Sequence, residues 1–316
     1  MTMHKMFPEV GHENDGRVDL SYEDAQDWIL LEGAQSMADH HPAELLGDDE
    51  AGPFFFLSSS EPRDEELHRV PAHGHDADSW RMTVQGTTNM GREAYSAGDF
   101  RFQDGGAPYA ADNATWGPDG GYGIVMFADR RGFPVRPVQA EHVEETARQQ
   151  EIIADILEVE VESPLAYPPA IATTFGGTER AHLNESFVSA ETWDEVTAGV
   201  RMAAGVLGDP ECGPVVLMID ATPGSTAIPA LRLDTEVLHV VVEGTASSDR
   251  EQAVGNLWFH RPGVDAPAIT AGVAGLQSVA VVADRRAVGG MISADSAWSD
   301  AVISITSSLT AQLAVA

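Results

Sequence analysis

Two histidines separated by a single residue are the strongest chemical feature of this sequence. His73 and His75 lie in the segment HGHDAD, and alternate residues of an extended strand point to the same side. Two imidazoles placed in this way suit a shared metal ion. The pair therefore predicts a bound divalent transition metal, one of Fe, Mn, Ni, Cu or Zn. The alternative interpretation is a polar turn without a ligand.

The strand that follows the histidines carries an arginine on the same side. In the same alternation, Arg81 shares its side with Ser79 and Thr83. An inward-facing guanidinium is costly to bury without a partner, and its planar fork suits a carboxylate or phosphate group. We predict that Arg81 binds substrate and takes part in catalysis. The alternative is an internal ion pair with Asp78, Asp104 or Asp112.

Polar and aromatic residues further along the chain are candidates for contact with a substrate. Gln103 and Tyr95 are expected on neighbouring strands, and Trp116 lies near the end of the run GGAPYAADNATWGPDGG. The glycines and prolines of this run suit a long loop that closes over an opening. We predict that these three residues contact substrate, with Trp116 in the lid. For Tyr95 and Trp116 the alternative is ordinary packing.

The composition excludes several classes of protein. The chain has 50 acidic and 18 basic residues, a formal net charge of −32, and no basic segment. Nucleic acid and anionic membrane are therefore poor partners. Cys212 is the only cysteine, so an intrachain disulfide cannot form. Because neither a signal peptide nor a long apolar span is visible, we expect a soluble, cytoplasmic protein.

The sequence contains an internal duplication. LGDDEAGP from Leu46 recurs as LGDPECGP from Leu207, and each copy is followed by an apolar run. The segments that begin at Val70 and Ile228 then align without a gap. Each copy ends in a hydrophobic strand followed by Asp-Arg-Arg, which we interpret as a structural element because both copies carry it. Two related domains are expected.

Each copy reads as a series of short strands. Runs of Val, Ile, Phe and Tyr alternate with Gly, Pro, Asn and Asp, which is typical of an all-β sandwich or barrel. Helical periodicity predicts three helices outside the copies. They are expected from Gln139 to about residue 161, from an N-cap at Ser189 to about Val206, and from Ser293 to Leu313.

With the duplication established, the first copy resembles the cupin superfamily. Counting from Gly86, His73 and His75 occupy the positions of the paired histidine ligands of that superfamily. Ser79 stands at the position of its glutamate ligand, and Tyr109 at the position of its third histidine. The resemblance implies a metal bound by His73 and His75, with Tyr109, a carboxylate or water completing the shell. Tyr109 is also a candidate catalytic acid.

The second copy lacks these residues. Leu231 and Leu233 replace the two histidines, Val237 stands at the glutamate position and Ala266 at the third-histidine position. Such side chains neither bind a metal nor transfer a proton. The chain thus resembles a two-domain cupin, a bicupin, whose second cupin is degenerate and structural.

These observations combine into a predicted architecture of two tandem cupin (jelly-roll) β-barrels with peripheral helices, all-β in class. The expected domains are an N-terminal extension (1–45), a first cupin domain with the site (46–135), a helical connector (136–206), a degenerate cupin domain (207–290) and a C-terminal helix (291–316).

The predicted function is that of a cupin-type small-molecule enzyme with a mononuclear metal at His73 and His75. The reaction is either that of a dioxygenase or that of a metal-assisted lyase or isomerase. The alternative is a metal-free cupin that binds or senses a small anionic ligand. The resemblance also implies a homodimer.

Overall fold

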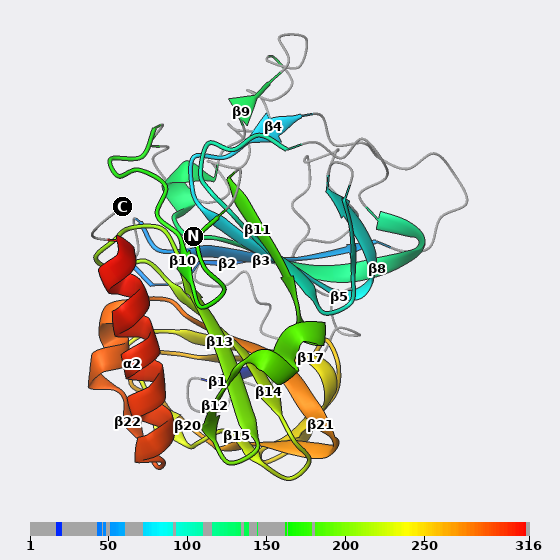
Figure 1. Cartoon of the computed structure of the whole chain (residues 1–316), viewed down its shortest axis with the longest axis vertical. Helices are drawn as coiled ribbons and strands as arrows, with labels where there is room; N and C mark the ends of the chain where they lie inside the picture. Colours follow the sequence, from blue (N-terminus) through cyan, green and yellow to red (C-terminus); the bar gives the residue numbers. More distant parts are fainter. Residues whose placement is uncertain are drawn as a thin grey trace. The chain divides into compact units, whose positions relative to one another are not determined.

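A computed structural model describes residues 17–20, 43–45, 47–48, 51–60, 72–90, 93–109, 116–133, 136–138, 144, 162, 164–178 and 181–313. The described residues fall into two compact units, the first within 25–169 and 178–184, the second within 9–24, 170–177 and 185–316. Both units are built mainly from antiparallel strands (Figure 1). The all-β jelly-roll class predicted from the sequence is confirmed.

The first unit contains one large sheet in the order β11-β7-β5-β8-β3-β2, with β6 paired to β5, and a small sheet of β4 and β9. Its strands are β2 (Ala43–Leu45), β3 (Phe54–Ser60), β4 (His73–Gly74), β5 (Ser79–Met90), β6 (Glu93–Ser96), β7 (Asp99–Gln103), β8 (Trp116–Phe127), β9 (Arg136–Pro137) and β11 (His182–Ser186). Strand β11 follows the first copy in the sequence but joins its sheet.

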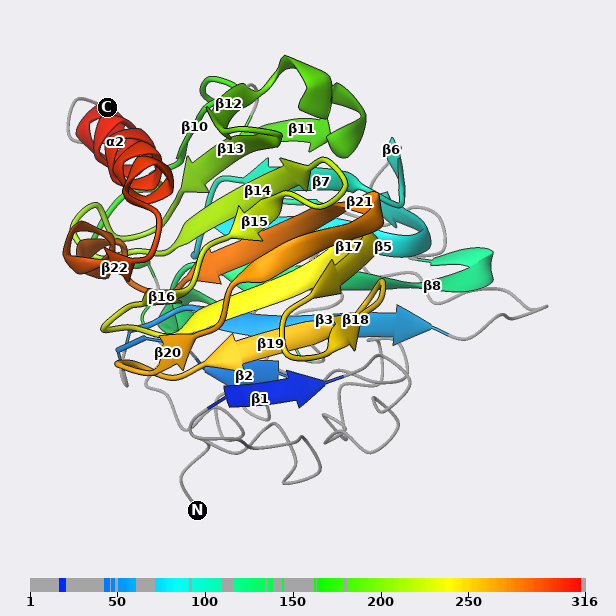
Figure 2. The ribbon, with the colours of Figure 1, turned by 90° about the horizontal axis from the view of Figure 1, so that it is seen from below.

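The second unit contains a larger sheet in the order β1-β19-β17-β21-β14-β13-β10, to which β12, β15 and β18 attach, and a small sheet in the order β20-β16-β22. Strands β13, β14, β21 and β17 lie side by side in Figure 2. The strands are β1 (Arg17–Leu20), β10 (Ala172–Thr173), β12 (Asp194–Thr197), β13 (Val200–Val206), β14 (Val215–Ala221), β15 (Thr226–Ile228), β16 (Leu231–Arg232), β17 (Val237–Ser247), β18 (Glu251–Gln252), β19 (Leu257–His260), β20 (Asp265–Ala266), β21 (Ile269–Val282) and β22 (Ile292–Ser293).

The duplication is visible in matching strands and turns. Strand β5 corresponds to β17. In its sheet β5 is paired with β8, and β17 is paired with β21 in the same way; β8 and β21 are the long strands that end the two copies. Gly86 and Gly244, which align in the two copies, both have a φ of 78°. A positive φ favours glycine because it has no Cβ atom. The shared turn geometry explains why both copies keep a glycine at this position.

The Asp-Arg-Arg endings form the same corner in both units. The Asp129 carboxylate accepts a hydrogen bond from the Arg131 backbone and pairs with its guanidinium at 2.6 Å. Asp284 makes the equivalent contacts with Arg286, at 2.5 Å. A short 3-10 helix begins at each corner, η2 (Arg130–Gly132) in the first unit and η5 (Arg285–Gly290) in the second. The structural interpretation of these motifs is confirmed.

The core of the second unit is apolar where the first copy carries its histidines. Leu231, Leu233, Val237 and Ala266 are all at most 8 % exposed and belong to one hydrophobic cluster with strands β13, β14 and β21. Helix α2 (Ser296–Leu313) packs against β13 and β10 and contributes Trp298 to the same cluster (Figure 1). The four positions are therefore part of the packed apolar interior of the second unit.

Of the three predicted helices, the C-terminal one is present as α2, within the predicted range Ser293–Leu313. The helix predicted from Ser189 to Val206 is wrong. That stretch contains the end of a 3-10 helix, η4 (Phe187–Thr192), followed by the hairpin β12–β13. Gly199 has a φ of 73° and makes the tight turn of this hairpin. The helix predicted from Gln139 lies almost entirely outside the described residues.

Segments 172–173 and 182–206 therefore contain strands where a helical connector was expected. The domain boundaries drawn from the sequence stay a prediction. Among the described helices, none combines the length and the apolar character that a membrane span requires.

Candidate functional site

His73 is the first residue of the two-residue strand β4, and His75 follows that strand directly. Their side chains are 8 % and 6 % exposed, and their rings meet edge to face with centroids 5.1 Å apart. Tyr109 pairs with His73 through two backbone hydrogen bonds, of 2.9 and 2.8 Å. Because residues paired across antiparallel strands share a side, this bridge brings the phenol to the histidines.

Three side chains converge on the hydroxyl of Tyr109. Its oxygen lies 2.8 Å from Nε2 of His73, 3.1 Å from Nε2 of His75 and 2.7 Å from Nη2 of Arg81. We call His73, His75 and Tyr109 the histidine–tyrosine cluster. Within the described residues, no group of three or more His, Cys, Asp or Glu side chains could hold a metal ion. The histidine–tyrosine cluster instead combines two imidazoles with one phenol.

The protonation of this cluster follows from one backbone carbonyl. Nδ1 of His75 lies against the carbonyl oxygen of Phe133, which can only accept, so Nδ1 carries a proton. Burial, followed by the charges of His73 and Arg81, holds the pKa of His75 well below its usual value. His75 is therefore neutral, and its Nε2 accepts the hydrogen of the Tyr109 hydroxyl.

The remaining two bonds of the hydroxyl must then be donated to it. The guanidinium of Arg81 can only donate, and Nε2 of His73 donates as well because the single Tyr109 hydrogen is already used. The Tyr109 oxygen thus makes three hydrogen bonds, one donated and two accepted. Such a saturated hydroxyl is rigidly oriented.

Arg81 connects the cluster to the interior of the barrel. Its guanidinium carbon lies 4.0 Å from the centre of the Tyr109 ring and 5.7 Å from that of Phe127. Among the described residues, the one other hydrogen-bond partner of the guanidinium is the sulfur of Met90, 3.4 Å from Nη1. A thioether is a weak acceptor, so most of the donor capacity of Arg81 is unused.

The internal ion pair considered for Arg81 is not formed with either Asp78 or Asp104. Asp78 accepts a hydrogen bond from the backbone of Gly105 at 2.7 Å, and Asp104 accepts from Thr178 at 2.9 Å. Asp112 lies outside the described residues. Within the described part of the chain, Arg81 has no carboxylate partner.

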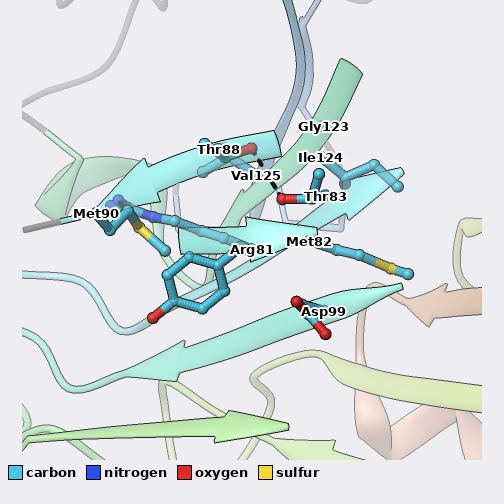
Figure 3. Close-up of a pocket in the computed structure, with 10 residues that line it drawn as sticks. Arg81, Met82, Thr83, Thr88, Met90, Asp99, Gly123, Ile124 and Val125 are labelled. Carbon is cyan, nitrogen blue, oxygen red and sulfur yellow. Dashed lines mark hydrogen bonds between the residues drawn. The ribbon is translucent and has the colours of Figure 1, made fainter. Parts of the chain in front are cut away.

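A pocket opens beside Arg81. It has a volume of about 90 Å³ and is lined by Arg81, Met82, Thr83, Thr88, Met90, Tyr95, Asp99, Gly123, Ile124 and Val125. Figure 3 shows the Arg81 side chain extending along the pocket toward Met90, with Asp99 on the neighbouring strand β7. Thr83 and Thr88 hydrogen bond to each other at 2.8 Å, as drawn in the same view.

Of the residues predicted to contact substrate, Tyr95 lines this pocket but belongs to a separate network. Its hydroxyl lies 2.8 Å from both Glu93 and Asn184 and accepts a hydrogen bond from Arg101 at 3.1 Å. Burial raises the pKa of Tyr95 to about 12. Tyr95 is therefore a neutral residue of the pocket wall.

Gln103 is buried and supports the loop that carries Tyr109. Its Nε2 donates to the carbonyl of Ala107 at 2.9 Å, two residues before Tyr109, whereas its Oε1 has no partner in the described structure. Trp116 begins strand β8 opposite Thr88, and its side chain lies outside the described residues. Ser79, at the glutamate position, is 2 % exposed.

Two contributors were not predicted from the sequence. The carbonyl of Phe133 orients His75, and a backbone carbonyl has no signature in a sequence. Arg101 lies directly opposite Arg81 in the register of β5 and β7. Counting residues outward along β5 and β7 from the segment that joins them could have shown that Arg101 pairs with Arg81.

Comparison with known proteins supports the fold. A provisionally assigned dioxygenase from Nostoc punctiforme superposes with a TM-score of 0.54 at 10% identity, covering 89% of this chain and 87% of that one. Salicylate 1,2-dioxygenase from Pseudoaminobacter salicylatoxidans has a TM-score of 0.49 at 11% identity, with coverages of 87% and 83%. Oxalate decarboxylase from Bacillus subtilis has a TM-score of 0.44 at 12% identity, with coverages of 88% and 78%.

No family model and no curated protein sequence matches the chain. The first of these structural likenesses extends over most of both chains, and the predicted two-barrel cupin fold is confirmed. At such low identity a likeness establishes the fold alone. The chemistry of the site has to be argued from the residues of this chain.

Proposed function

We propose that the first barrel holds a mononuclear transition metal and that the protein is a small-molecule enzyme. Two imidazole nitrogens and one phenolic oxygen would bind the ion, which would take the place of the hydrogen that Nε2 of His73 carries in the metal-free cluster. The observation that carries this proposal is the convergence on Tyr109, whose oxygen lies 2.8 Å from Nε2 of His73 and 3.1 Å from Nε2 of His75. Ligands bound at about 2.1 Å to one ion lie about 3 Å from their neighbours, so the donor atoms suit a common ion.

The orientation of His75 supports the same proposal. Metal-binding histidines generally donate their second ring N–H to a carbonyl or carboxylate, which directs the other nitrogen at the ion. In this chain the Phe133 carbonyl plays that part for Nδ1 of His75. The lowered pKa of His75, caused mainly by burial, keeps the ring in the neutral form that a metal requires.

Arg81 positions the phenol of a site that lacks the carboxylate ligand of the cupin pattern. Ser79 stands at the glutamate position and brings no negative charge to the site. The guanidinium of Arg81 donates to the phenolic oxygen of Tyr109 at 2.7 Å and holds it in place. In this proposal Tyr109 is a metal ligand, and Arg81 is its positioning partner.

A bound transition metal would supply Lewis-acid or redox chemistry to a small substrate. The side chains of this chain hold the ion in a buried position and orient the substrate. The identity of the metal separates the two reaction classes, because a dioxygenase needs a redox-active ion and a lyase or isomerase does not.

Elemental analysis of untagged protein tests the proposal, after expression with Fe, Mn, Ni, Cu and Zn supplied. We expect about one metal ion per chain, and we expect His73→Ala and His75→Ala each to lose it. His239→Ala, a histidine of the second unit, is the matched control and should retain it. Wild-type protein without stoichiometric metal would contradict the proposal and favour a metal-free binder of a small anion.

A further inference from the structure

The wall of the first barrel carries two arginines on one side. Arg81 on β5 and Arg101 on β7 are paired across the strands, as are Ser79 and Gln103. Paired residues share a side, and like charges placed opposite each other destabilise a sheet. A pair of guanidinium groups in this position therefore calls for compensating negative charge.

The compensation within the described residues is unequal. Arg101 is 7 % exposed, lies 3.6 Å from the Glu93 carboxylate and donates to the hydroxyl of Tyr95. Arg81 contacts only the Tyr109 hydroxyl, the Met90 sulfur and aromatic rings. Its Nε has no hydrogen-bond partner, and neither has the Nε of Arg101. Arg81 is partly buried, and a partly desolvated cation without a carboxylate partner favours binding an anion from solution.

The pocket beside Arg81 has room for a small anion. Its volume of about 90 Å³ is smaller than the cavity of roughly 150 Å³ that accepts benzene, so it holds about four heavy atoms. Asp99 also lines this pocket, and its carboxylate accepts a hydrogen bond from the backbone of Ser96 at 2.8 Å. A second negative charge on the ligand would be repelled by Asp99.

We propose that this pocket binds a short-chain monocarboxylate of two or three carbon atoms, with its carboxylate on the guanidinium of Arg81. The inference deepens the proposed function and rests on it, because it names the class of substrate for that enzyme. Arg81 also donates to Tyr109. The bound carboxylate would therefore share the guanidinium of Arg81 with the Tyr109 hydroxyl of the histidine–tyrosine cluster.

Calorimetric titration of metal-stripped protein with acetate and with its neutral analogue acetamide tests this inference. We expect acetate to bind and acetamide not to bind. Arg81→Gln should weaken acetate binding by roughly 10- to 100-fold, since hydrogen bonds to charged groups contribute about 1.5–3 kcal/mol. Arg232→Gln, an exposed arginine of the second unit, is the matched control and should leave the affinity unchanged.

Asp99→Asn provides an independent test of charge selectivity. Wild-type protein should bind the dianion malonate more weakly than acetate, and Asp99→Asn should reduce that difference. Equal binding of acetate and acetamide by wild-type protein would overturn the inference even if Arg81→Gln failed to fold. Metal content is measured separately, so loss of metal contradicts the proposed function, whereas loss of acetate binding contradicts only the substrate class.

Discussion

At the scale of single residues, the Tyr109 hydroxyl is the point on which the site depends. It accepts hydrogen bonds from the buried His73 and the partly buried Arg81, and gives its own hydrogen to His75. Loss of one partner from a buried polar group leaves the other partner with its full desolvation cost. The cluster is therefore a unit whose members stabilise one another.

Tyr109→Phe should destabilise the metal-stripped protein by about 1–3 kcal/mol, because Arg81 and His73 lose their acceptor. Urea unfolding measures this change in the free energy of unfolding. The double variant Tyr109→Phe/Arg81→Met gives the coupling between the two side chains, which we expect to be about 1–2 kcal/mol. Additive effects in the double variant would show that the 2.7 Å contact contributes no stability.

At the scale of elements, the second unit reuses the strands of the first with different interior residues. His239 on β17 corresponds to Arg81 and lies opposite Trp258 on β19, with ring centroids 4.6 Å apart. It is 1 % exposed, and neither ring nitrogen has a hydrogen-bond partner in the described structure. Burial lowers the pKa of His239 to about 3.

This buried histidine predicts a loss of stability in acid. In the unfolded chain the pKa of His239 is near the ordinary value of about 6.5. Below that pH the unfolded state binds a proton that the folded state does not bind. Its contribution to stability is complete above about pH 6.5 and is lost as the pH falls toward about 3.

The variant His239→Leu removes this pH-dependent contribution to the free energy of unfolding. We expect it to be at least as stable as wild type at pH 8, and to lose less stability between pH 6.5 and about 4. Urea unfolding at a series of pH values measures both effects. An unchanged pH dependence would mean that His239 is not excluded from protonation in the folded protein.

Much of the architecture could be predicted from the sequence because the duplication repeats the turn chemistry. Aligned glycines such as Gly86 and Gly244 limit the strands in both copies, and alternation assigns their faces. The hairpin β12–β13 was mistaken for a helix because Trp193 and Val200, seven residues apart, also fit a helical spacing. Only the turn at Gly199, with its positive φ, separates the two interpretations.

The site could be predicted less completely. Alternation along a strand was enough to pair His73 with His75 and to place Arg81 on their side. The contact of Tyr109 with His73 depends on how a long loop folds back, and local sequence does not determine such a closure. The unpaired state of Arg81 depends on where every nearby carboxylate lies, which only the three-dimensional structure gives.

At the scale of the whole molecule, the dominant property is charge. The chain has 50 acidic residues against 18 basic ones. Several of the arginines are already committed to local pairs, as at the two Asp-Arg-Arg corners. The excess carboxylates therefore repel one another, and this repulsion opposes the compact state. The homodimer expected from the sequence stays a prediction.

Salt should consequently stabilise the protein. Raising sodium chloride from about 0.01 M to 1 M shortens the screening length from about 30 Å to 3 Å, which removes most repulsion between exposed carboxylates. We expect the thermal midpoint to rise by roughly 3 °C, equivalent to about 2 kcal/mol for a protein of this size. Calorimetry at a series of salt concentrations measures the shift.

Choline chloride at equal ionic strength separates screening from specific binding. Screening depends on ionic strength and not on the kind of cation, so both salts should raise the midpoint similarly. A rise with sodium but not with choline would instead indicate sodium ions bound between carboxylates. A midpoint that falls or stays constant in both salts would show that local ion pairs, which salt weakens, outweigh the repulsion implied by a net charge of −32.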